Sequence, residues 1–96
     1  MPDQFEWDEL KALANVRKHG ISFEEAVEAI MDPEAVVIRD DMHSLIEDRF
    51  QVIGLSARGI LSVIFVDRQN ETVCRIISAR GASQKERNLY YEKNKN

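Results

Sequence analysis

The sequence has 96 residues, of which 44% are hydrophobic and 31% charged, and its formal net charge is −4. A chain of this length forms one domain, residues 1–96, which excludes a second domain and disfavours a deep substrate cavity. The longest apolar stretch, residues 60–66, is too short to span a bilayer, and the N-terminus lacks the basic and apolar regions of a signal peptide. The single cysteine, Cys74, cannot form an internal disulfide. We therefore expect a cytoplasmic protein that has no membrane partner.

Charge is divided unevenly along the chain. Residues 1–74 contain 7 Lys/Arg and 15 Asp/Glu, a balance of −8, whereas residues 75–96 contain 6 and 2, a balance of +4. An acidic body with a basic C-terminal end is compatible with two partners of opposite charge. Ordinary variation among charged helices accounts for the same split, so charge alone does not decide between the two interpretations.

Two helices are predicted near the N-terminus. Asp8 is a suitable N-cap for a first helix, which ends at Gly20 because glycine readily adopts the left-handed conformation found there. Ser22 and Glu25 form a capping box for a second helix. This helix should stop near Asp32, because the residue before a proline avoids the α region. The very short link between the two helices predicts a helical hairpin.

The middle of the chain is predicted to form strands. Their expected ranges are 35–39, 50–55, 60–66 and 72–79, and residues 60–66 have the nearly continuous apolar character of a central strand. The last three strands follow one another through tight connections, so we predict an antiparallel meander. Ahead of the first helix, Phe5 and Trp7 form either a short strand or a hydrophobic staple on that helix.

A third helix is predicted at the C-terminus. Ser83 and Glu86 form a second capping box, and the helix continues through Tyr90 before a polar tail. The expected fold class is therefore α+β, with an N-terminal helical hairpin, an antiparallel β-sheet meander and a C-terminal helix. The last strand brings Arg75 and Arg80 towards the start of the third helix, where backbone N–H groups favour anions.

The residues able to carry chemistry are mainly cations. The sequence has no recognisable Ser/His/Asp or Cys/His combination, no glycine-rich phosphate loop and no zinc-ligand spacing, so we expect neither a cofactor nor a metal. Metal-free cleavage of RNA needs the 2′-OH deprotonated, the charge at phosphorus stabilised and the leaving oxygen protonated. Arginine suits the second task, because its planar fork matches phosphate oxygens and stays charged. Fixed cations of this kind often make the largest catalytic contribution.

Arg80 is the strongest candidate, because it ends a strand just before the start of a helix. Arg75 alternates with core positions and is equally compatible with a solvated face. Lys18 and His19 lie in the last turn of the first helix, where the helix dipole also favours cations. Histidine is a suitable proton donor or acceptor at neutral pH.

The tyrosines and the acid of the third helix have structural interpretations as well. The capping box alone explains Glu86. Tyr90 and Tyr91 follow Arg87 at helical spacing, and we expect one ring to pack on the sheet and the other to stack on a base.

Five groups of residues follow one another in an ordered pattern. They are Phe5-Glu6-Trp7-Asp8; Asn15 with Lys18-His19-Gly20; Ser22-Phe23-Glu24-Glu25-Ala26; Arg49-Phe50 with Ile53-Gly54; and Arg75-Ile76-Ile77-Ser78-Ala79-Arg80 with Ala82, Glu86-Arg87 and Tyr90. Together they resemble the BrnT family of toxins, and the resemblance covers nearly the whole chain.

The resemblance implies a fold like that of the RelE-type ribonuclease toxins and a metal-independent endoribonuclease that cleaves RNA and blocks translation. It also implies a cognate BrnA-like antitoxin, a ribbon-helix-helix protein through which the complex would bind DNA indirectly. Position by position, it implies catalytic roles for Arg80, His19, Arg68 and Glu86. It implies substrate binding by Lys18, Arg75, Arg87 and Tyr90.

The chain departs from the family pattern in two respects. Gly81 occupies a position where family members commonly carry a second basic residue, and the chain is net acidic where many members are basic. The alternative function is therefore a catalytically weak or inactive homologue that binds the antitoxin and acts as a co-repressor module. A metabolic enzyme has almost no support, because the chain is short and lacks cofactor motifs.

Overall fold

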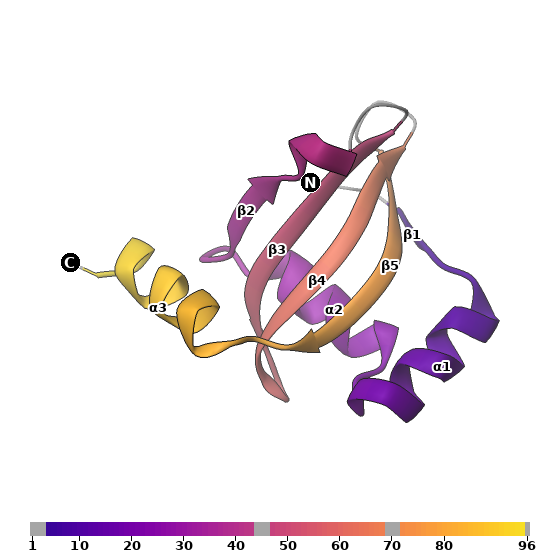
Figure 1. Cartoon of the computed structure of the whole chain (residues 1–96), viewed down its shortest axis with the longest axis horizontal. Coiled ribbons are helices and arrows are strands. Elements are labelled where there is room, and N and C mark those ends of the chain that lie inside the picture. Colours follow the sequence, from indigo (N-terminus) through magenta and orange to yellow (C-terminus); the bar gives the residue numbers. More distant parts are fainter. Residues whose placement is uncertain (1–3, 44–46, 69–71, 96) are drawn as a thin grey trace.

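A mixed five-stranded sheet forms the centre of the computed structural model, which describes residues 4–43, 47–68 and 72–95 (Figure 1). Within these residues the strand order is β1-β5-β4-β3-β2. The strands are β1 (Gln4–Glu6), β2 (Val36–Arg39), β3 (Asp48–Ser56), β4 (Gly59–Arg68) and β5 (Val73–Gly81). Neighbouring strands from β2 to β5 run antiparallel, and the expected α+β class is confirmed.

The expectation of a wholly antiparallel sheet is wrong at one edge. β1 pairs with β5 in parallel, and Phe5 lies opposite Cys74 while Glu6 lies opposite Arg75. Of the two alternatives for this segment, the strand is therefore correct. A three-residue strand without a turn signal carries no information about which distant strand it will join, so the parallel pair is not readable from local pattern.

The helices begin and end at the predicted caps. Asp8 accepts hydrogen bonds from the backbone N–H groups of Leu10 and Lys11 at the start of α1 (Glu9–His19), and Gly20 follows it with φ 71°. α2 (Phe23–Met31) begins with the complete capping box of Ser22 and Glu25. In the part of the chain that the structure describes, no helix is long and apolar enough to cross a membrane.

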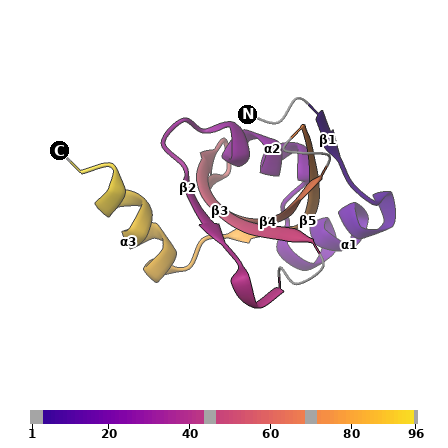
Figure 2. The same cartoon turned by 90° about the horizontal axis from the view of Figure 1, so that it is seen from above.

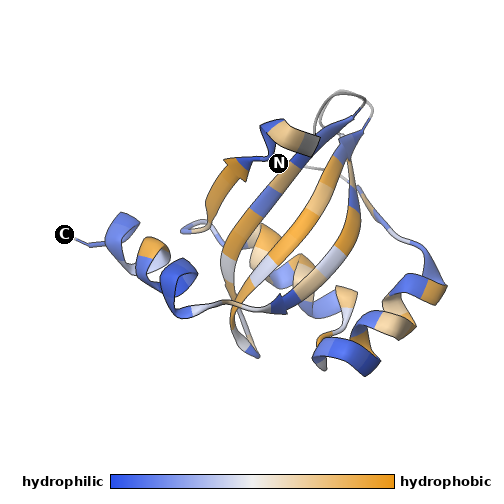
Figure 3. Cartoon of the chain, in the orientation of Figure 1, coloured by the Kyte–Doolittle hydropathy of each residue, from blue (hydrophilic) through white to orange (hydrophobic). Residues whose placement is uncertain are grey.

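Both N-terminal helices pack mainly on the sheet, so the helical hairpin that we expected is not confirmed. α2 lies across one face and contacts β3, β4 and β5, whereas α1 contacts β5 (Figure 2). The apolar face of α2 drives this arrangement, because Phe23, Ala26 and Ala29 are fully buried against the sheet. The hydrophobic residues run along the central strands, while α3 (Gln84–Lys93) is largely hydrophilic (Figure 3).

Among the described α-helices, only α3 packs on the opposite face of the sheet, and it does so at one end. Side chains alternate along a strand, so Ile53 and Ile60 point away from the face that α2 covers. They form a small second cluster with Tyr90 of α3. We call this side of the sheet, beyond the cluster with Tyr90, the open face.

Asn15 seals an edge of the sheet that β1 is too short to cover. Its side-chain amide donates to the Ala79 carbonyl at 2.8 Å and accepts from the Ala79 N–H at 3.1 Å, as a neighbouring strand would. The same amide nitrogen donates to the Ile21 carbonyl at 2.9 Å. Asn15 is buried, so these bonds satisfy backbone groups that water does not reach.

Gly54 allows α2 to approach β3 closely. A Cβ atom at this position would lie 2.1 Å from the Ala29 carbonyl oxygen, a backbone atom that cannot move without the helix. Glycine is therefore required here by the distance between helix and strand.

Replacing Gly54 with alanine should destabilise the protein by about 2 kcal/mol or more, because α2 must shift away from β3. Gly81→Ala is the matched control, since a Cβ there meets no atom within 4 Å. Urea unfolding of the two variants measures the difference, and equal stabilities would contradict the close packing at Gly54.

Asn15→Asp should cost at least about 2 kcal/mol, because a buried carboxylate would face two carbonyl oxygens that the amide now satisfies. Asn88→Asp serves as the control, because Asn88 is exposed and its side chain only accepts from Gln84. Thermal unfolding distinguishes the variants. A wild-type melting temperature for Asn15→Asp would show that the edge of β5 does not depend on this amide.

Candidate active site

Four arginines share the open face of the sheet. Residues directly opposite each other on paired strands point to the same side. Arg49 and Arg75 both lie opposite Val66, and Arg68 lies opposite Val73. Arg80 lies opposite Ser62, on the same side and at the other end of β5. Arg75 and Arg80 are five residues apart, so strict alternation would place them on opposite faces. The register shift of β5 at Ile64 and Phe65 of β4 instead brings both to the face that α1 and α2 leave uncovered.

Arg80 is held by a bidentate ion pair with Glu86. Its Nη1 lies 2.8 Å from Oε1 and its Nη2 lies 2.9 Å from Oε2 of the carboxylate. Nη1 also donates to the Gly81 carbonyl at 3.2 Å. The hydrogen bond with Glu86 raises the pKa of Arg80, against the opposing effect of burial. The side chain is nevertheless 45% exposed, so a charged and oriented guanidinium reaches solvent.

Glu86 accepts hydrogen bonds from three different elements. Besides the two from Arg80 of β5, its carboxylate accepts from the Ser83 N–H at 2.8 Å, within the capping box of α3. It also accepts from the Gln51 amide of β3 at 2.7 Å. These bonds, with that from Arg80 contributing most, lower the pKa of Glu86 to about 2, although burial opposes the shift. The carboxylate is therefore ionised at neutral pH.

Gln51 and Ser62 continue this network into the sheet. The Gln51 amide nitrogen donates both to Glu86 and, at 2.8 Å, to the Ser62 hydroxyl. Ser62 is only 2% exposed, so the far end of the network is fixed in the interior. Sequence reasoning missed both residues, although the alternation of β3 places Gln51 on the same face as Arg80.

A second cation pair lies towards the other end of β5. Nη1 of Arg75 lies 2.6 Å from Oε2 of Glu6, and Nη1 of Arg68 lies 3.4 Å from the same oxygen. Sequence reasoning missed Glu6 as their partner, because β1 is brought beside β5 only by the parallel pairing. Arg75 and Arg80 lie opposite Val66 and Ser62, which are four residues apart on β4, and this corresponds to roughly 13 Å along a strand. The two groups of arginines are therefore suited to different phosphates of one strand.

Lys18 and His19 lie at the same end of the molecule as Arg80. Both are exposed in the last turn of α1. Asn15, one turn earlier, contacts Ala79, which directly precedes Arg80, and Figure 1 shows this end of α1 beside the end of β5. The end of α1 that carries the two residues is thus held beside the edge of β5, whereas Arg80 points to the open face.

Tyr90, for which the resemblance implies substrate binding, packs on the sheet. It is 8% exposed, and its hydroxyl donates to Asp32 at 2.7 Å. Burial, followed by the bond to Asp32, raises the pKa of Tyr90 to about 12. Of the two tyrosines, Tyr90 is therefore the one that packs on the sheet, whereas Tyr91 is 54% exposed and Arg87 is also exposed.

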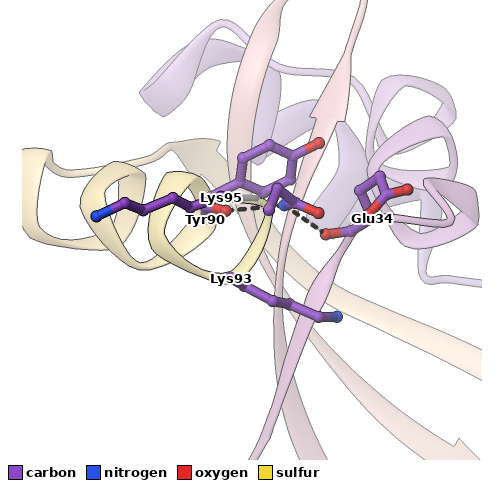
Figure 4. A pocket seen from close by; sticks show the side chains of 5 residues that line it. Glu34, Tyr90, Lys93 and Lys95 are labelled. Atoms are coloured by element: carbon purple, nitrogen blue, oxygen red, sulfur yellow. Dashed lines mark hydrogen bonds between the residues drawn. The ribbon is translucent and has the colours of Figure 1, made fainter.

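Two surface hollows accompany these groups. One, of about 390 Å³, lies beside the C-terminal end of α3, where Asn94 donates to the Glu34 carbonyl at 3.1 Å (Figure 4). It contains none of the arginines. The other, of about 380 Å³, borders Gln51 and Ile64 of the sheet beside a short 3-10 helix, η1 (Asp41–His43). Within the described ranges, no group of three His, Cys, Asp or Glu side chains is placed to hold a metal ion.

Chemically, the open face offers anion recognition. It presents arginines whose carboxylate partners fix their orientation, and arginine forks match phosphate oxygens. No curated protein matches the chain. The family model described as "Ribonuclease toxin, BrnT, of type II toxin-antitoxin system" matches residues 7–86. This range includes Arg80, Glu86 and Gln51, and the chain therefore belongs to the BrnT family of ribonuclease toxins.

Proposed function

We propose that this protein is the toxin of a type II toxin–antitoxin pair and that it is a metal-independent endoribonuclease whose cleavage of RNA inhibits translation. The observation that carries the proposal is the guanidinium of Arg80, charged, oriented by Glu86 and open to solvent. The α+β architecture supports a likeness to the RelE-type toxins in overall plan.

In the proposed reaction, the 2′-oxygen of a ribose forms a bond to the adjacent phosphorus and the bond from phosphorus to the 5′-oxygen breaks. Arg80 stabilises the negative charge that develops on the phosphate oxygens. His19 is the proposed proton acceptor for the 2′-OH or donor to the leaving oxygen. Arg68 and Arg75 bind a neighbouring phosphate, and Lys18 and Arg87 add exposed cations around the strand.

Glu86 takes a different part from the proton-transfer role that a catalytic carboxylate often has. Its pKa of about 2 keeps it without a proton at neutral pH, so it is no general acid there. Each carboxylate oxygen accepts two hydrogen bonds, which fills its lone-pair capacity. In the proposed mechanism Glu86 therefore orients Arg80.

The proposed partner is a BrnA-like ribbon-helix-helix antitoxin, with DNA bound only through it. Residues 1–74 carry a balance of −8, which complements a cationic partner segment. The alternative function, an antitoxin-binding co-repressor with little or no ribonuclease activity, is favoured by Gly81. This position lies beside Arg80, and nothing lies within 4 Å of the place where a side chain would begin.

Arg80→Ala should lower the rate of cleavage of a defined RNA by roughly 10²–10³-fold, the usual cost of removing one charge-stabilising donor. Arg58→Ala is the control, because Arg58 lies in the β3–β4 turn and is paired with Glu25 at 3.5 Å. Single-turnover cleavage and growth arrest on expression are the measurements. Intact RNA with wild-type protein that still binds an antitoxin would overturn the ribonuclease and support the co-repressor.

Glu86→Gln should lower the stability at pH 7 by at most about 3 kcal/mol, because the carboxylate loses its charge beside Arg80. The folded-state pKa of about 2 lies below the ordinary value of 4.5, so this stabilisation is complete above pH 4.5. It is lost as the pH falls towards 2. Urea unfolding of wild type and variant from pH 7 to pH 3 should show the difference narrowing below pH 4.5, and a constant difference would refute this role of the charge.

A further inference from the structure

Four of the five N–H groups of Arg80 form two edges of the guanidinium, and the fifth points to one side. The edge formed by Nη1 and Nη2 faces Glu86, and the remaining hydrogen of Nη1 points to the Gly81 carbonyl. The Nε–H group and the outer hydrogen of Nη2 meet no acceptor in the described part of the chain. These two groups form the second fork of an arginine, and such a fork matches two oxygens of one phosphate.

The direction of this second fork depends on Glu86, and Glu86 depends on Gln51. Both amide hydrogens of Gln51 are used, one by Ser62 at 2.8 Å and one by Glu86 at 2.7 Å. Ser62 is buried, and Gln51 lies on the nine-residue strand β3, so the anchor of the network is rigid. The chain of contacts runs from the sheet interior to the exposed guanidinium.

We propose that Gln51 is a positioning residue for Arg80: by fixing the Glu86 carboxylate, it keeps the Nε–Nη2 edge of Arg80 open and aimed at the phosphate of the RNA. This inference rests on the proposed ribonuclease function and assigns to it a residue on a strand far from Arg80 in sequence. Gln51 does not touch the phosphate, so it acts only through Glu86.

Gln51→Leu tests the proposal, because leucine fills a similar volume and removes both amide hydrogens. The matched control is Gln84→Leu, since Gln84 is exposed on α3 and, among the described residues, its side chain bonds to Asn88 alone. Circular dichroism and thermal unfolding establish that both variants are folded. If Gln51→Leu does not fold, Gln51→Asn replaces it, because its shorter side chain keeps the polarity but draws the amide back from Glu86.

The first measurement is independent of catalysis. Arg80→Lys assigns the Nε–H signal of Arg80 in a ¹H–¹⁵N NMR spectrum by removing it. We expect this signal to be sharp in wild type and in Gln84→Leu, and to broaden or shift towards that of a free guanidinium in Gln51→Leu. An unchanged signal in Gln51→Leu overturns the proposal.

The second measurement is a double-mutant cycle on single-turnover RNA cleavage. Gln51→Leu should slow cleavage about tenfold, the usual effect of losing a hydrogen bond to a charged group, with RNA affinity changed less than about twofold. In an Arg80→Ala background the same substitution should change the rate less than about twofold, because its effect passes through Arg80. Equal effects in both backgrounds would mean that Gln51 acts on the fold alone and would overturn the proposal.

Failure of the proposed function gives a different result. If wild-type protein leaves RNA intact, the ribonuclease function falls, and the NMR signal of Arg80 alone decides whether Gln51 positions the guanidinium.

Discussion

The structure of the site depends on one carboxylate that three elements share. Glu86 closes the capping box of α3, binds both terminal nitrogens of Arg80 at the end of β5 and accepts from Gln51 on β3. Each bond alone is ordinary, but together they join the start of a helix, the end of one strand and the middle of another. Because the acceptor capacity of the carboxylate is full, any change at one of the three partners alters the environment of the other two. The position of the start of α3 and the orientation of Arg80 therefore depend on the same carboxylate.

The division of the sheet into two faces gives the arginines their place. One face buries the core against α2, and the close contact at Gly54 holds that helix near the strands. The other face carries the arginines, because α3 packs there on the cluster around Tyr90 and leaves the arginine positions uncovered by a helix. Asn15 takes over the edge of β5 beyond β1, and so the strand that carries Arg75 and Arg80 needs no further strand beside it. A small domain thereby keeps a stable core on one side and a site on the other.

The parts of this fold that were predictable are those that depend on neighbouring residues. The helix starts at Asp8, Ser22 and Ser83 were predictable, because a capping side chain bonds to backbone N–H groups only two or three residues further along the chain. The face that Arg80 occupies was not predictable in this way, because it depends on the register shift within β5. The parallel pairing of β1, the seal made by Asn15 and the bond from Gln51 to Glu86 join residues 35 or more positions apart, and no local pattern encodes such distances. Helical spacing indicates that one of the two adjacent tyrosines is buried, but only the position of α3 on the sheet shows that it is Tyr90.

The pairing of the arginines also reconciles an acidic protein with an anionic substrate. Arg80 is paired with Glu86, while Arg68 and Arg75 share Glu6. These arginines of the open face are therefore parts of oriented ion pairs and are not unpaired positive charges. Binding through total charge would suffer from a net charge of −4, because non-specific affinity for RNA comes from phosphate neutralisation. Binding through oriented forks depends instead on where a few donors point, and orientation costs no rearrangement at the moment of reaction. Two of the carboxylates that lower the net charge of the domain, Glu6 and Glu86, thus also orient its arginines, so an acidic composition and a phosphate-directed site are consistent with each other.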